Sequence, residues 1–183
     1  AGAGLEALIA LLDKPGEQHL LILFLNPSEM RPIGGFAGSY GEVILEQGSI
    51  KEIKVNDIYY PDHFLTRKIV PPRQLQSVTV DWGARDAAWF FDFPVSAKKT
   101  MELLEASEVY SKDNIKFDGV VAVNVRVIED ILELTGPIKL PDYNLTLTRD
   151  NFLEEIQKEV ETGRDKQAGE NPKRVLGSLA PIL

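Results

Sequence analysis

The sequence predicts an α/β fold: a single layered domain over residues 1–183, with a mixed central sheet flanked by helices. Apolar runs of strand length occur at residues 19–25 and 117–124, and between and after them apolar residues recur at helical spacing. Residues 39–56 resemble a hairpin, which would make the sheet mixed. The length of 183 residues and the 44% hydrophobic content suit one domain of this kind.

In the first half of the chain, a short helix is expected at residues 5–12 and a strand at residues 19–25. The continuous apolar run predicts that this strand is buried on both faces, in the middle of the sheet. Strands at 39–46 and 50–56 would pair through a turn that contains Gly48. Residues 57–79 are long for a connector and are predicted to be a functional loop or, alternatively, a solvated flap.

In the second half, Pro94 is expected to open a helix that runs to about Ser107. A second buried strand is predicted at 117–124, followed by a helix at 125–134 that Gly136 ends and by a short strand at 138–140. Thr148 is expected to cap the next helix, and a final helix should start at Pro172. The core stripe of the helix after Thr148 would be Phe152, Ile156 and Val160.

The composition narrows the classes of partner. A net charge of -8 argues against nonspecific nucleic-acid binding, which requires a basic surface. The absence of cysteine and the presence of two histidines disfavour a transition-metal site, so any metal would be magnesium or calcium held by carboxylate oxygens.

The ends of the sequence also carry a prediction. No stretch reaches the roughly 18 apolar residues of a membrane helix. The chain begins with Ala-Gly-Ala-Gly and stops within an apolar pattern, so we expect it to be part of a longer, membrane-anchored protein.

The first candidate site is the glycine-dense stretch 26–40, which follows the first strand. Peptide N–H groups of such a loop can cradle an anion such as a phosphate, and a nearby arginine adds a forked donor. The candidate ligand-binding residues here are Arg31, Gly34, Gly35 and Ser39. A tight turn in which the glycines satisfy backbone geometry is the alternative, because the glycines lead into a strand and match neither a P-loop nor a Rossmann fingerprint.

The second candidate site is the block 81–94, in which charges stand among tryptophans and phenylalanines. Arg85 and Asp86, together with the late Lys173, are candidate ligand-binding residues, and Asp57 and Asp92 are candidate ligands for magnesium. The alternative is that Arg31 and Arg85 form structural ion pairs with Glu29, Asp86 or Asp92. Open α/β sheets bind ligands at the carboxyl ends of their strands, which here are the Asn26 loop and Asn124.

Several blocks resemble a bacterial family, domain-of-unknown-function family four thousand and twelve, over nearly the whole chain. The blocks are Asn-x-x-Glu-x-Arg-x-x-Gly-Gly-Phe-x-Gly-Ser-Tyr at 26–40, Arg-Asp-Ala-x-Trp-x-x-Asp-Phe-Pro-x-Ser-Ala at 85–97, an Asp-Gly-Val strand and a helix ending Leu-Thr-Gly-Pro at 118–137, and Val160-Glu161 followed by Pro172-Lys173.

The order of strand, Arg-bearing loop, hairpin and Asp-Gly strand is also distantly similar to the LytR-CpsA-Psr phosphotransferases of the bacterial cell wall. That resemblance implies an α/β sheet with a lipid pocket, arginines on a pyrophosphate and a magnesium ion. Gly34 and Gly35 stand where those transferases carry a Ser-Asp pair, and their later Arg-x-Arg is absent.

These observations lead to two functional hypotheses. The first is an extracytoplasmic cell-envelope domain that binds a phosphate-containing ligand, such as a polyprenyl phosphate or a glycan, in a cleft between the Arg31 loop and the Arg85 block. A glycopolymer phosphotransferase is its enzymatic version. The alternative is a noncatalytic interaction or scaffold module of a membrane-anchored surface protein.

Overall fold

The computed structural model describes residues 2, 6, 9–10, 13–163 and 174–179. The helix expected at 5–12 and the helix start expected at Pro172 lie largely outside these residues. Within the described residues, no helix combines the length and apolar character needed to cross a membrane.

The centre of the fold is a four-stranded mixed sheet with the order β3-β2-β1-β4. Its strands are β1 (Glu17–Asn26), β2 (Phe36–Glu46), β3 (Ser49–Asp57) and β4 (Gly119–Asn124). β2 is antiparallel to β1 and to β3, whereas β4 runs parallel to β1. The two-residue turn between β2 and β3 has positive φ at Gln47 and Gly48, which matches the right-handed twist of the strands. The predicted mixed α/β fold and hairpin are therefore confirmed.

The position of β4 corrects one prediction. The apolar run 117–124 predicted a strand buried on both faces, but β4 is an edge strand and its residues are half-buried or exposed. Val121, for example, is 48% exposed. A run of valine and alanine specifies a strand, but whether a second neighbour covers its free edge depends on the order of the strands.

The remaining elements surround this sheet. They are the α-helices α2 (Tyr59–Asp62), α3 (Phe93–Glu105), α4 (Glu108–Ser111), α5 (Val125–Thr135), α6 (Phe152–Thr162) and α8 (Arg174–Leu179), the short 3₁₀ helices η1 (Ala84–Asp86) and η2 (Pro141–Tyr143), and the two-stranded sheet of β5 (Ile138–Leu140) and β6 (Leu145–Leu147). Strand β6 was not predicted, because its three residues are too few to show the alternation of apolar and polar residues that identifies a strand.

The two ends of α5 follow local signals, whereas the start of α6 does not. The Asn124 side chain accepts a hydrogen bond from the Arg126 N–H at the start of α5, and Gly136, with φ of 89°, ends this helix as predicted. The cap predicted at Thr148 is wrong, because α6 starts later, after Asn151. The Asn151 side chain instead accepts a hydrogen bond from the Thr148 N–H.

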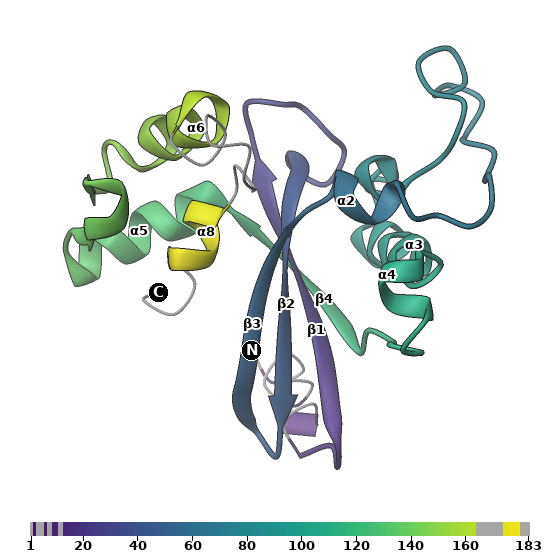
Figure 1. Ribbon diagram of the computed structural model, residues 1–183, viewed down its shortest axis with the longest axis horizontal. Coiled ribbons are helices and arrows are strands. Elements are labelled where there is room, and N and C mark those ends of the chain that lie inside the picture. The colour runs from purple at the N-terminus through teal and green to yellow at the C-terminus, as the bar shows by residue number, and fades with distance from the viewer. Residues whose placement is uncertain (1, 3–5, 7–8, 11–12, 164–173, 180–183) are drawn as a thin grey trace.

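Two hydrophobic clusters pack on either side of the sheet. The first joins β1 and β2 to α3 and α4, and it contains Leu21, Leu23 and Leu25, alternate residues of β1. The second joins α5, α6 and α8 to the small sheet and contains Phe152 and Ile156 of the predicted stripe. In Figure 1 the two groups of helices lie on opposite sides of the end of the sheet where β1 ends.

Candidate functional site

A cavity of about 290 Å³ lies beside the glycine-rich loop, at the carboxyl ends of β1 and β4. Its wall is mainly carbon and combines the end of the sheet with helices α5, α6 and α8. Residues that line the cavity include Phe24, Leu25, Asn26, Glu29, Phe36, Ser39, Asn124, Ile128, Phe152, Ile156, Gln157 and Leu179.

Strand pairing explains where the cavity lies. In the parallel pair of β1 and β4, Leu25 is opposite Asn124, so both strands end at the same edge of the sheet. The chain then turns away in both cases, into the loop 27–35 after β1 and into α5 after β4. The prediction that the Asn26 loop and Asn124 share one edge is confirmed, and both asparagines line the cavity.

The cavity is also where the two hydrophobic clusters meet. Leu25 and Phe36 on one wall belong to the first cluster, and Phe152, Ile156 and Leu179 on the other belong to the second. An apolar wall that is not closed by its own side chains favours an apolar guest, because filling it removes carbon surface from water.

The glycines of the loop 27–35 shape its backbone. Gly34 has φ of 102°, and its N–H donates to the carbonyl of Arg31 at 3.0 Å. A Cβ atom at position 35 would lie 2.6 Å from the carbonyl oxygen of Asn26, so only glycine allows this close approach. Both observations fit the tight-turn interpretation of the glycines, while Ser39, further along in β2, is buried and lines the cavity.

Arg31 is half-buried and lies next to the cavity wall. Its guanidinium carbon lies 5.1 Å from the ring centroid of Phe36, which lines the cavity, and its Nη1 donates to the carbonyl of Met30. Within the described part of the chain, the Arg31 guanidinium has no carboxylate in ion-pair range, so the pairing with Glu29 that the sequence left open is not formed. A cation with free donors beside an apolar cavity can bind an anion.

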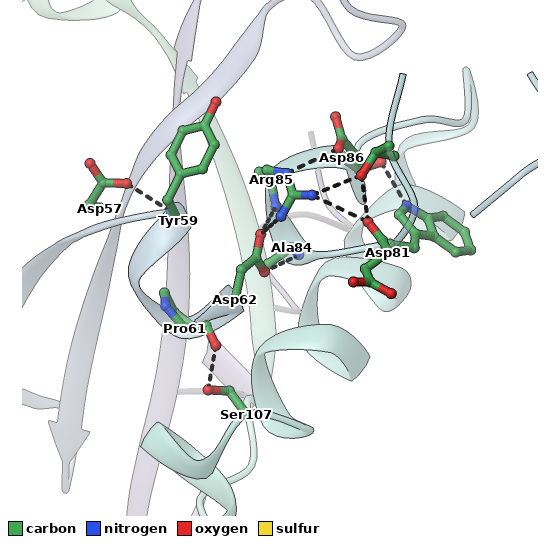
Figure 2. A network of polar contacts seen from close by, with 11 residues as sticks. Asp57, Tyr59, Pro61, Asp62, Asp81, Ala84, Arg85, Asp86 and Ser107 are labelled. Atoms are coloured by element: carbon green, nitrogen blue, oxygen red, sulfur yellow. Dashed lines mark hydrogen bonds and ion pairs between the residues drawn. The ribbon is translucent and has the colours of Figure 1, made fainter. Parts of the chain in front are cut away.

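Arg85 is held quite differently, as Figure 2 shows. Its Nη1 lies 2.8 Å from the Asp62 carboxylate, and its Nε lies 3.4 Å from the Asp86 carboxylate. Its Nη2 donates to the Thr79 hydroxyl and to the carbonyl of Asp81. The interpretation of Arg85 as a structural ion-pair residue therefore agrees with the geometry, with Asp62 as the main partner.

The Asp62 carboxylate is the centre of this network. Its oxygens accept hydrogen bonds from the N–H groups of Ala84 and Arg85 as well as from the guanidinium. A Cβ atom at position 83 would overlap this carboxylate, so Gly83 makes room for it. Burial raises the pKa of Asp62 above its usual value, although the hydrogen bonds from Ala84 and Arg85 act in the opposite direction.

Two aromatic rings lie between the two arginines. The ring centroids of Phe36 and Tyr59 are 6.2 Å apart, and the guanidinium carbon of Arg85 lies 6.0 Å from the Tyr59 ring. Arg31 lies over Phe36 at the other end of this row. This row runs from the Arg31 loop to the Arg85 block, and Phe36 in it also lines the cavity, whose other wall comes from α5 and α6. A ligand-binding cleft between the Arg31 loop and the Arg85 block stays a prediction.

Comparison with known proteins places the chain in a family. A family model described as "Protein of unknown function (DUF4012)" matches residues 15–160. The chain belongs to the DUF4012 family. No match was found among curated proteins or among solved structures.

The predicted magnesium ligands of this DUF4012 domain have local partners. Asp57 accepts a hydrogen bond from the Tyr59 N–H at 2.7 Å, and Asp92 accepts one from the Val95 N–H at the start of α3. Among the described residues, no three His, Asp or Glu side chains are grouped as metal ligands. Magnesium binding stays a prediction, and the predicted ligand residue Lys173 lies outside the described residues.

The sequence analysis missed the far wall of the cavity in the DUF4012 domain. Ile128, Ile156 and Gln157 come from helices whose apolar stripes predicted core packing. A core residue and a cavity-lining residue have the same helical periodicity, so the sequence held no signal that separates them. No local pattern in the sequence indicates that Asp62 pairs with Arg85, 23 positions away.

Proposed function

We propose that this domain binds a lipid with a phosphate-containing head group, such as a polyprenyl phosphate, and does so as an extracytoplasmic part of the cell envelope. The hydrocarbon chain would occupy the cavity at the ends of β1 and β4, and the phosphate would lie at the loop that carries Arg31. The observation that supports this proposal most directly is the carbon-walled cavity beside Arg31, an arginine that has no ion-pair partner among the described residues.

The dimensions of the cavity suit part of a hydrocarbon chain. A volume of about 290 Å³ holds on the order of ten groups of water or methylene size, at roughly 30 Å³ each. Each buried methylene contributes about 0.8 kcal/mol, so two isoprene units would supply several kcal/mol of binding free energy. The remainder of a longer chain would leave through the open side of the cavity.

The head group would be recognised by polar atoms on the sheet side of the cavity. Arg31 can donate charge-assisted hydrogen bonds to a phosphate, while Asn26 and Ser39 line the same wall. Glu29 lines it too, and its carboxylate would repel a phosphate unless a cation lies between them. A magnesium ion shared by Glu29 and the phosphate would remove this repulsion, because magnesium prefers oxygen ligands of this kind.

The distant similarity to LytR-CpsA-Psr phosphotransferases supports the same class of ligand, since those proteins act on polyprenyl-pyrophosphate-linked glycopolymers. We propose binding as the function, and transfer of a glycopolymer is its enzymatic version. Hydrolysis of a polyprenyl pyrophosphate, with water as the acceptor and with polyprenyl phosphate and inorganic phosphate as products, would support the enzymatic version if Arg31→Ala abolishes it.

The scaffold hypothesis has support of its own from one observation. It predicts that the arginines are paired with carboxylates, and Arg85 is paired with Asp62 and Asp86. The ligand-binding hypothesis predicts instead an apolar cavity with an arginine beside it that is not held in an ion pair, which is the environment of Arg31 among the described residues.

Calorimetric titration with farnesyl phosphate below its critical micelle concentration, with and without magnesium, tests the proposal. Ile128→Trp would fill the cavity from α5 and should abolish binding. Val127→Trp is the matched control, because Val127 is the neighbouring residue on the same helix but is exposed and does not line the cavity. Binding that survives Ile128→Trp would reject the cavity as the site.

The head group is tested with a second pair of variants. Arg31→Gln should weaken farnesyl phosphate binding by roughly tenfold to a hundredfold. This factor corresponds to the loss of one charge-assisted hydrogen bond, which contributes about 1.5–3 kcal/mol. Lys139→Gln, at an exposed position of β5, should leave the affinity unchanged. Farnesol, which lacks the phosphate, should bind wild type and Arg31→Gln equally. Equal loss of farnesol binding in Arg31→Gln would show that Arg31 shapes the cavity without recognising phosphate.

A further inference from the structure

The long connection between α2 and η1 contains a compact loop, residues 70–81. Its two ends are joined by the hydrogen bond from the Trp82 N–H to the carbonyl of Ile69, at 2.8 Å. Inside it, the Gln76 side chain donates to the carbonyl of Pro71, and Leu75 is buried. Loops with close ends and internal packing of this kind are ordered surface features and frequently carry function.

The Arg85 network holds the base of this loop. Arg85 Nη2 donates to the Thr79 hydroxyl and to the Asp81 carbonyl, and it does so from a guanidinium that is already fixed on Asp62. Arg85 therefore ties the end of the loop to Asp62, and Figure 2 shows the contact of its guanidinium with Asp81.

The loop exposes apolar side chains although Leu75 and the Gln76 hydrogen bond give it internal packing. Val70, Val78 and Val80 are 75%, 78% and 83% exposed. Single exposed valines are common on protein surfaces, but three on one ordered loop of twelve residues form an unpartnered apolar surface.

The charge around these valines has the opposite sign from that of the whole chain. Residues 64–81 contain Arg67, Lys68 and Arg73 and a single acidic residue, Asp81, whose carboxylate lies 3.7 Å from the Lys68 ammonium. This segment is therefore net positive, whereas the chain has a net charge of -8. All three basic residues are exposed. Apolar side chains next to basic residues fit the interface of an anionic bilayer, where the head groups attract cations and the acyl boundary accepts hydrocarbon.

The loop also points in a suitable direction. Figure 1 shows it rising beside α2 beyond the end of the sheet at which β1 terminates, which is the end that carries the loop 27–35 and the cavity. Exposed Met30 lies in the loop 27–35 at this same end.

We propose that residues 70–81 dock this domain on an anionic membrane surface, with the three valines in the head-group region and with Arg67, Lys68 and Arg73 against lipid phosphates. This docking does not depend on the ligand of the cavity. Docking would place the end of the sheet that carries the loop 27–35 and the cavity next to the membrane. A lipid ligand could then pass from the membrane into the cavity.

The first test is binding to vesicles of phosphatidylcholine with about 30% phosphatidylglycerol, a composition that gives a negative surface potential. The chain contains no cysteine, so a single introduced cysteine, Val78→Cys, can be labelled specifically with an environment-sensitive fluorophore. Ile50→Cys, labelled in the same way, is the control, because Ile50 is exposed next to the β2–β3 turn. We expect a blue shift for the label at position 78 and none for the label at position 50. An unshifted label at position 78, or equal shifts at both positions, would overturn the proposal.

The second test separates the apolar from the charged contribution by co-sedimentation with the same vesicles. Changing the three valines to serine should reduce binding at least tenfold, whereas serine at three other exposed apolar residues, Ile50, Val127 and Leu134, should not. Replacing Arg67, Lys68 and Arg73 with glutamine should weaken binding to anionic vesicles by roughly fivefold per residue. Equal glutamine substitutions at Lys112, Arg126 and Lys139 control for net charge.

Three results would contradict membrane docking by this loop. Wild-type protein could bind vesicles of pure phosphatidylcholine as tightly as anionic ones, or the triple serine variant could bind as wild type does. Alternatively, Ile128→Trp, which fills the cavity, could abolish vesicle binding, which would show that the cavity and not the loop holds the lipid. Vesicle binding that Ile128→Trp leaves unchanged supports docking even if farnesyl phosphate fails to bind.

Discussion

At the scale of single residues, the two motif arginines differ in what surrounds their guanidinium groups. Arg85 lies within a network of two carboxylates, a hydroxyl and a carbonyl, whereas Arg31 stacks on Phe36 and donates to the neighbouring carbonyl of Met30. The first environment stabilises the fold, and the second leaves donors for a ligand.

This difference predicts that the same substitution lowers stability by different amounts at the two positions. Arg85→Met leaves the Asp62 carboxylate, whose side chain is 5% exposed, without its counter-charge. We expect a loss of about 2–4 kcal/mol in the free energy of unfolding, slightly below the range for fully buried pairs. Arg31→Met should cost less than about 1 kcal/mol, because no ion pair is lost. Urea denaturation measures both, and equal losses would refute the distinction.

A second prediction concerns the buried tyrosines Tyr40 and Tyr110, whose hydroxyl oxygens are 2.7 Å apart. Burial, reinforced by the nearby phenol and Glu42, raises the pKa of Tyr40 far above its usual value, and burial likewise raises the pKa of Tyr110. Since the folded state retains both protons, their contribution to stability is intact below the unfolded pKa of about 10 and decreases as the pH rises above it.

The free energy of unfolding should therefore fall above about pH 10, by up to ~1.4 kcal/mol per pH unit for each tyrosine. Tyrosinate absorbance followed together with circular dichroism is the measurement, and the two residues should ionise as the protein unfolds. Tyr40→Phe should make the decrease shallower. Ionisation of all five tyrosines in a protein that stays folded would contradict this prediction.

At the scale of elements, the start of α3 depends on a single capping side chain, Asp92. Asp92 accepts a hydrogen bond from the Val95 N–H and caps a helix whose buried face includes Leu103 and Leu104. Asp92→Ala should reduce stability by about 1 kcal/mol, whereas Asp92→Ser, which retains a capping oxygen, should be close to wild type. Thermal unfolding distinguishes the two.

The same pair of variants tests the magnesium prediction. If Asp92 were a magnesium ligand, added magnesium would raise the melting temperature of wild type and would have no such effect on Asp92→Ser. If it acts as a helix cap alone, magnesium should affect the two proteins equally.

At the scale of the whole molecule, the sheet separates two hydrophobic clusters that come closest around the cavity. A ligand in the cavity would contact Phe36 of the first cluster and Phe152 of the second. We therefore expect bound farnesyl phosphate to stabilise α5 and α6 more than the hairpin of β2 and β3, which contributes to one wall.

At a ligand concentration about a hundred times its dissociation constant, the stabilisation should be about 2.7 kcal/mol, which corresponds to a rise of roughly 5–10 °C in melting temperature. Hydrogen exchange should show the added protection in α5 and α6. Protection that is strongest at the β2–β3 turn, or a melting temperature that the ligand leaves unchanged, would speak against binding in the cavity.

The sequence by itself determined the features that depend on neighbouring residues. The apolar run of β1, the turn at Gly48 and the end of α5 at Gly136 follow from period and backbone preference, which act over a few positions. The family signatures also lie in the sequence, and they marked both the loop 27–35 and the Arg85 block.

The tertiary structure decided what each of these features contacts. The order of the strands placed β4 at an edge of the sheet. Asp62 is the main partner of Arg85, but the two residues are 23 positions apart, so no local pattern links them. The cavity arose where the wall of α5 and α6 leaves space against the ends of two strands, and residues that line it have the same periodicity as core residues. Burial and pairing across the chain depend on distances in space, which a local pattern does not contain.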